Sequence, residues 1–166
     1  MYENLVKKLL SLPVVPPSGI LITEQKNNGN IINVNYLANP IYKPLQCWYN
    51  CKAHVNKNGG SVVFGWSLFE KEDVLIAQHH AVWIDQDNQY YDLTENPHGK
   101  KTVFLIDERA QFDYQNLRHP ANFYYISDSE YCWGEFTKDI MRPQYFIAKR
   151  KPNSNELNDI NSLIKQ

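Results

Sequence analysis

Three residues in the middle of the chain are of the types that together attack carbonyl groups: Cys47, His80 and Asp92. A cysteine nucleophile needs an ionised thiol, a nearby base and a group that orients that base. An imidazole can serve as the base, and a carboxylate beside it holds its tautomer and stabilises the imidazolium form. These three residue types therefore fit acyl transfer through a thioester, provided that folding brings the three side chains together.

The segment around Cys47 predicts a helix that begins close to this residue. Residues 46–58 contain no proline or glycine, Pro44 lies just upstream, and Gly59-Gly60 is a typical helix stop. Cys47 then lies in the first turn, where the helix macrodipole lowers the pKa of a thiol. Cys51 lies one turn further on, and we expect it to face the core.

His79 and His80 lie within residues 74–84, which are typical of a strand. Neighbouring side chains on a strand point to opposite faces, so only one histidine can face a given site. Asp92 belongs to the next predicted strand, across one short turn, and a hairpin of this length can make His80 and Asp92 cross-strand neighbours.

The remaining pattern predicts an α+β fold with an amphipathic helix first and an antiparallel meander after the cysteine helix. The expected elements are a helix at 2–11, a hairpin in 20–37, strands at 61–69, 74–84, 89–93, 102–106 and 145–148, and a polar helix at 155–164. Residues 107–143 show no clear pattern. We expect one domain over 1–152 and a polar C-terminal helix or tail over 153–166.

Composition narrows the function classes. The chain has 166 residues, 17 basic and 18 acidic, and a net charge of -1, so no basic surplus favours nucleic acid. No apolar run is long enough to cross a membrane. Cys47, Cys51 and Cys132 are too few for a disulfide framework, which favours a reducing compartment, the cytoplasm by default. The oligomeric state stays open.

The order of motifs resembles the transglutaminase-like branch of the papain-like cysteine enzymes. The resemblance covers residues 46–95 and consists of Cys47 with Asn50, then Gly59-Gly60, Gly65-Trp66, His80-Ala81-Val82-Trp83 and Tyr91-Asp92-Leu93-Thr94. Small bacterial proteins carry a similar pattern. The resemblance implies a helix that starts at the nucleophilic cysteine and packs on an antiparallel sheet.

The resemblance implies Cys47 as nucleophile, His80 as general base and acid, and Asp92 as orienter. Gln46 or backbone N–H groups would form the oxyanion hole, and Asn50, Trp66 and Trp83 are further candidates to line the substrate site. The enzyme would be a hydrolase or acyltransferase acting on a peptide, isopeptide, glutamine side chain or small amide, with no cofactor. The early end of the helix at Gly59-Gly60 departs from larger transglutaminases, so cross-linking is less favoured.

Other interpretations stay open. The same fold could be a binding module without turnover. A zinc site is a further alternative, with Cys47, Cys51, His79 and His80 as its possible ligands, although two adjacent histidines on a strand do not easily share one metal. Asn50 could equally cap a loop, and both tryptophans fit a core or cleft wall better than a ligand platform.

Overall fold

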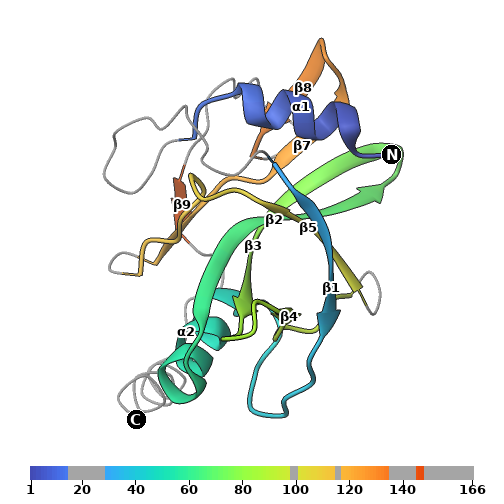
Figure 1. Ribbon diagram of the computed structural model, residues 1–166. Helices are drawn as coiled ribbons and strands as arrows, with labels where there is room; N and C mark the ends of the chain where they lie inside the picture. The colour runs from blue at the N-terminus through green and yellow to red at the C-terminus, as the bar shows by residue number, and fades with distance from the viewer. Residues whose placement is uncertain (15–28, 98–100, 115–116, 135–144, 148–166) are drawn as a thin grey trace. The chain divides into compact units, whose positions relative to one another are not determined.

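The computed structural model describes residues 1–14, 29–97, 101–114, 117–134 and 145–147 (Figure 1). Mixed α+β content is confirmed. The elements in chain order are α1 (Glu3–Ser11), β1 (Ile31–Tyr36), α2 (Cys47–Asn58), β2 (Ser61–Lys71), β3 (Val74–Ile84), β4 (Tyr90–Asp92), β5 (Lys101–Ile106), β6 (Arg118–Pro120), β7 (Phe123–Ser127), β8 (Glu130–Trp133) and β9 (Tyr145–Ile147).

The strands do not form the simple antiparallel meander that the sequence predicts. They pair in the order β2-β5-β1-β4-β3-β7-β8, and β2 also pairs with β3, which closes five of them into a small barrel. β1 runs parallel to β4, with Asn35 opposite Tyr91. A parallel pair needs a long crossover rather than a tight turn, and the segment that contains α2 supplies it.

Two further differences concern the second half of the chain. Residues 107–143, which show no clear pattern in the sequence, contain the short strands β6, β7 and β8. These strands have three to five residues each, too few for a periodic signal. The predicted helix at 155–164, the tail at 153–166 and the first half of the predicted hairpin at 20–37 lie outside the described residues.

The chain divides into two compact units. Unit 1 consists of residues 1–32, 64–79 and 103–148, and unit 2 of residues 33–63, 80–102 and 149–166. The core of unit 1 is apolar and includes Leu5 and Leu9 of α1, Trp66 of β2 and Phe123 of β7, all completely buried. α1 lies beside β7 (Figure 1). Unit 2 contains α2, β4 and every residue of the predicted Cys-His-Asp set.

A buried ion pair joins three parts of unit 1. Arg109 Nε and Nη2 donate to the two carboxylate oxygens of Asp107 at 2.8 and 2.9 Å, and Nη1 donates to the carbonyl of Leu12 at 2.9 Å, just past α1. Trp66 Nε1 donates to the same carboxylate at 2.9 Å. Both charged residues are almost completely buried, so the pair is retained only because every polar atom named here has a partner.

Removing one partner of this pair should destabilise unit 1 strongly. Arg109→Met leaves the Asp107 carboxylate buried without its cation, and we expect the free energy of unfolding in urea to fall by roughly 3–5 kcal/mol. Arg118→Met is the matched control, because Arg118 pairs with Asp113 but its side chain is 36% exposed. That change should cost less than about 1 kcal/mol. Equal losses of unfolding free energy in the two variants would contradict the conclusion that the buried pair of Arg109 and Asp107 stabilises unit 1.

Candidate active site

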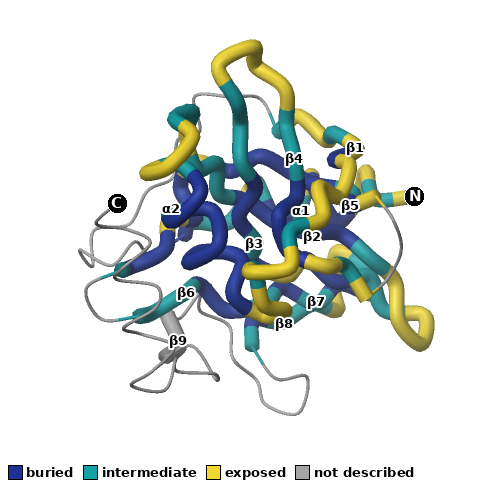
Figure 2. Tube along the Cα trace, turned by 90° about the horizontal axis from the view of Figure 1, so that it is seen from below, coloured by how far each residue is buried: buried dark blue, intermediate teal, exposed yellow. Residues whose placement is uncertain are grey.

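Helix α2 presents Cys47 as its first residue. The first hydrogen bond inside the helix runs from the Asn50 N–H to the Gln46 carbonyl at 2.9 Å. The N-terminal end of the helix, with its partial positive charge, therefore lies at Cys47. The first turns of α2 are buried and its C-terminal end reaches solvent (Figure 2). Cys47 is 5% exposed.

His80 and Asp92 come from adjacent antiparallel strands and form the predicted pair. His80 Nε2 lies 2.8 Å from Asp92 Oδ2. The register places Trp83 opposite Tyr91 and therefore continues to Val82 opposite Asp92. His80 is two residues from Val82 and on the same face, so it is the diagonal neighbour of the carboxylate. The geometric prediction for this pair is confirmed.

The His80 ring also has Cys47 as a hydrogen-bond partner. Burial alone would lower the pKa of His80, but the charges of Asp92 and then Cys47, together with hydrogen bonds to both, raise its pKa well above the ordinary 6.5. The His80 ring therefore has both Asp92 and Cys47 as partners. The arrangement favours the protonated, imidazolium form of His80.

The carboxylate of Asp92 is 1% exposed and remains an anion. Burial would raise its pKa, but the charge of His80 and hydrogen bonds from His80, Thr102 and the Thr94 backbone outweigh burial and lower the pKa. Thr102 Oγ1 donates to Oδ2 at 2.6 Å, and the Thr94 N–H donates to Oδ1 at 3.0 Å. The two threonines are contacts of the orienter to which the sequence analysis assigned no role.

Asn50 links the cysteine helix to the end of β4. Its Nδ2 donates to Thr94 Oγ1 at 2.9 Å and to the carbonyl of Lys43 at 2.9 Å, and the residue is 5% exposed. Both of its amide protons are thereby used within unit 2. Asn50 is therefore placed to fix the helix relative to Asp92 through Thr94, rather than to bind a substrate with its amide protons.

Gln46 carries a buried side-chain amide whose nitrogen has no hydrogen-bond partner among the residues that the structure describes. The residue is 2% exposed and directly precedes Cys47. Among the described residues, none accepts a hydrogen bond from Gln46 Nε2. An unsatisfied buried donor costs about 1–3 kcal/mol, so such a group in a folded protein requires an explanation.

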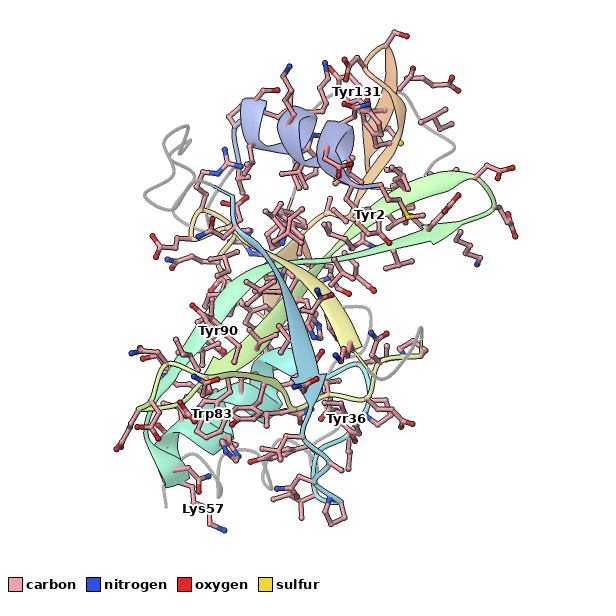
Figure 3. All side chains as sticks on the ribbon, turned by 45° about the vertical axis from the view of Figure 1, so that its right-hand side comes forward. Tyr2, Tyr36, Lys57, Trp83, Tyr90 and Tyr131 are labelled. Carbon is pink, nitrogen blue, oxygen red and sulfur yellow. The ribbon has the colours of Figure 1, made fainter. Side chains whose placement is uncertain are left out.

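The two predicted tryptophans differ in position. Trp83 belongs to unit 2, where its indole N–H donates to the Gly59 carbonyl at 2.9 Å and its ring packs edge-on against His54, beside α2 (Figure 3). It holds the end of α2. Trp66 is completely buried in the core of unit 1. Its indole N–H donates to the buried Asp107 carboxylate of that core, so we withdraw Trp66 as a candidate to line the substrate site.

His79 and His80 diverge as the alternation of strand side chains predicts. His79 belongs to unit 1, is buried, and its Nε2 lies 2.6 Å from the Ala110 carbonyl, while its ring stacks on Phe64. Its ring is thus committed to a different set of contacts from that of His80.

The other thiols differ from Cys47. Cys51 is completely buried, and burial, then the charges of Cys47 and Asp92, raise its pKa well above the ordinary value. Burial also raises the pKa of Cys132. All three cysteines are free thiols. In the part of the chain that the structure describes, no group of three or more His, Cys, Asp or Glu side chains is arranged to hold a metal ion.

No protein-family model matches the chain, and no curated protein or solved structure is significantly similar to it. Among the described helices, neither has the length and apolar character needed to cross a membrane. The geometry of unit 2 is therefore the basis for any functional assignment.

The raised pKa of His80 and the lowered pKa of Asp92 predict how the pair stabilises the protein. The ordinary pKa values of the two side chains are 3.8 for Asp92 and 6.5 for His80, and the stability that the pair contributes is fully present between these two pH values. It is lost above this window as His80 deprotonates through its raised pKa, and below it as Asp92 protonates through its lowered pKa. At pH 5.5, His80→Gln should lower the free energy of unfolding by about 2 kcal/mol.

His54→Gln is the control for this pH dependence. Burial, then the charge of Lys57, lowers the pKa of His54, so its contribution is present above 6.5 and is lost as the pH falls. Urea unfolding of wild type and both variants from pH 4 to 9 should therefore show opposite trends. A His80→Gln difference that does not vary with pH would contradict the ion pair.

Proposed function

We propose that the protein is a cysteine hydrolase or acyltransferase that forms a thioester at Cys47, with His80 as general acid and base and Asp92 as orienter. The observation that carries the proposal is the continuous chain of contacts from Cys47 through the His80 ring to the 2.8 Å pair with Asp92. A buried carboxylate, an imidazole and a thiol at a helix N-terminus are together what an activated cysteine requires.

The proposed reaction has two steps. The Cys47 thiolate attacks the carbonyl carbon of an amide, and the His80 imidazolium gives its proton to the leaving amine as the C–N bond breaks. His80 then takes a proton from water or an acceptor amine, which attacks the thioester carbonyl and releases the acid or the new amide. The Cys47 thiolate leaves, and His80 is again protonated.

Gln46 is proposed as a donor to the oxyanion that forms in both steps. Its support is the buried Nε2, which has no hydrogen-bond partner among the described residues and lies one residue before the nucleophile. A donor that is kept unsatisfied in the resting protein can bind an oxygen that becomes negatively charged in the transition state. Asn50 and Trp83 are proposed to position the cysteine helix.

The finer description of the fold is also a proposal. A helix beginning at the cysteine, with the histidine and aspartate on neighbouring strands, is the feature shared with papain-like and transglutaminase-like enzymes. The free thiols fit a reducing compartment such as the cytoplasm. The competing proposal, a binding module without turnover, predicts an unreactive Cys47 and is separated by the next experiment.

Cys47 should react with iodoacetamide at pH values far below those at which thiols usually react. At pH 6 we expect labelling at Cys47 at least roughly tenfold faster than at Cys132, because only the former has an imidazolium partner. His80→Gln should remove this advantage at pH 6, because the Cys47 thiol loses its imidazolium partner. Labelling is followed by peptide mass spectrometry.

Cys132 is the internal control in each sample, because its environment does not change between wild type and His80→Gln. In Asp92→Asn, the labelling rate of Cys47 should fall between the rates in wild type and in His80→Gln, since the His80 ring loses its anionic partner but keeps a hydrogen-bond partner. Slow labelling of all the cysteines at one rate would refute the enzymatic proposal and favour the binding module.

Gln46→Met separates the oxyanion donor from the nucleophile. Alkylation by iodoacetamide creates no oxyanion, so its rate at Cys47 should stay within about twofold of wild type. Acylation by p-nitrophenyl acetate does create one, and its rate should fall by about 10²–10³. The release of p-nitrophenol measures the second rate. A parallel loss in both reactions would show that Gln46 acts on the thiol instead.

A further inference from the structure

Thr102 and the proposed general base, His80, contact the same oxygen atom of Asp92. Its hydroxyl donates to Asp92 Oδ2 at 2.6 Å, and His80 Nε2 lies 2.8 Å from the same oxygen. The threonine comes from β5, whereas the histidine comes from β3. Thr102 is 2% exposed, so water does not readily replace this bond.

The direction of the Thr102 hydroxyl is determined by its second contact. Asn96 Nδ2 donates to Thr102 Oγ1 at 3.1 Å and to the Lys101 carbonyl at 3.3 Å. Because Oγ1 accepts the amide proton from Asn96, its own proton is available to Asp92, which as an anion can only accept. The chain of donors therefore runs from Asn96 through Thr102 to the carboxylate.

Two donors on opposite oxygens immobilise the carboxylate. Thr102 binds Oδ2 from one side and the Thr94 backbone N–H binds Oδ1. Charge-assisted bonds of this kind favour the ionised form and define the plane in which Oδ2 meets His80. Without Thr102, Oδ1 would keep the Thr94 N–H, but Oδ2 would have only the His80 ring to hold it in place.

We propose that Thr102 is a positioning residue: its hydroxyl holds Asp92 ionised and directed at His80, and thereby maintains the imidazolium that partners Cys47. The inference rests on the proposed function, because the readout that gives it meaning is a reactive Cys47. It adds a residue from outside the stretch 46–95 that carries the family resemblance.

The test combines a carboxyl titration with a reactivity profile. In protein labelled with ¹³C-aspartate, Thr102→Val should raise the pKa of Asp92, because the anion loses a donor. The iodoacetamide rate at Cys47 at pH 5 should fall roughly tenfold, the size of one hydrogen bond to a charged group. Thr102→Ser keeps the hydroxyl and should restore both values.

Thr94→Val is the matched control. It makes the same chemical change at another buried threonine, but its bond to Asp92 comes from the backbone and survives, so the pKa of Asp92 should not rise. A purely structural effect of losing a buried hydroxyl would instead affect both variants alike.

The outcomes separate the two proposals. If wild-type Cys47 reacts no faster than Cys132, the proposed function fails, and the role of Thr102 fails with it. If wild-type Cys47 is fast but Thr102→Val leaves the Asp92 titration and the Cys47 profile unchanged, only the role of Thr102 is overturned. A raised pKa in Thr102→Val but not in Thr94→Val or Thr102→Ser supports it.

Discussion

The architecture of unit 2 depends on one buried carboxylate. Asp92 is 1% exposed, and an anion in such a place is tolerated only if donors surround it. The donors come from three segments: His80 on β3, Thr94 just after β4, and Thr102 on β5. Satisfying this charge therefore fixes three neighbouring parts of the chain relative to one another.

The same requirement connects the carboxylate to the cysteine helix. Thr94, whose backbone binds Asp92, accepts the side-chain amide of Asn50, which lies one turn after Cys47. The helix and the strands are thus joined both by the hydrogen bond from Asn50 to Thr94 and by the contact of the His80 ring with Cys47. The carboxylate that orients the imidazole is therefore also connected, through Thr94 and Asn50, to the cysteine helix.

The parts predictable from sequence are those with local causes. The bounds of β3 follow from its apolar run and its polar turns. The start of α2 at Cys47 follows from Pro44 upstream, and its end follows from Gly59-Gly60. The His80–Asp92 pair follows from hairpin geometry alone. Thr94 could have been found too, since its N–H bond to an aspartate two residues earlier is a local turn pattern.

The parts that escaped prediction have distant causes. Thr102 reaches Asp92 from another strand, and nothing in the intervening sequence indicates that contact. The parallel pairing of β1 with β4 likewise depends on the crossover through α2. The sequence left Trp66 open between a core and a cleft wall, and its buried bond to Asp107, a residue 41 positions away, decides for the core.

The most direct test of the account is the protonation of His80 with and without its sulfur partner. Titration of the ring by ¹⁵N NMR should give a pKa well above the ordinary 6.5 in wild type. Cys47→Ser removes the negative charge but keeps the size of the side chain, and the pKa should fall while staying above 6.5, because Asp92 remains. An identical His80 titration in the two proteins would contradict the thiolate–imidazolium pair.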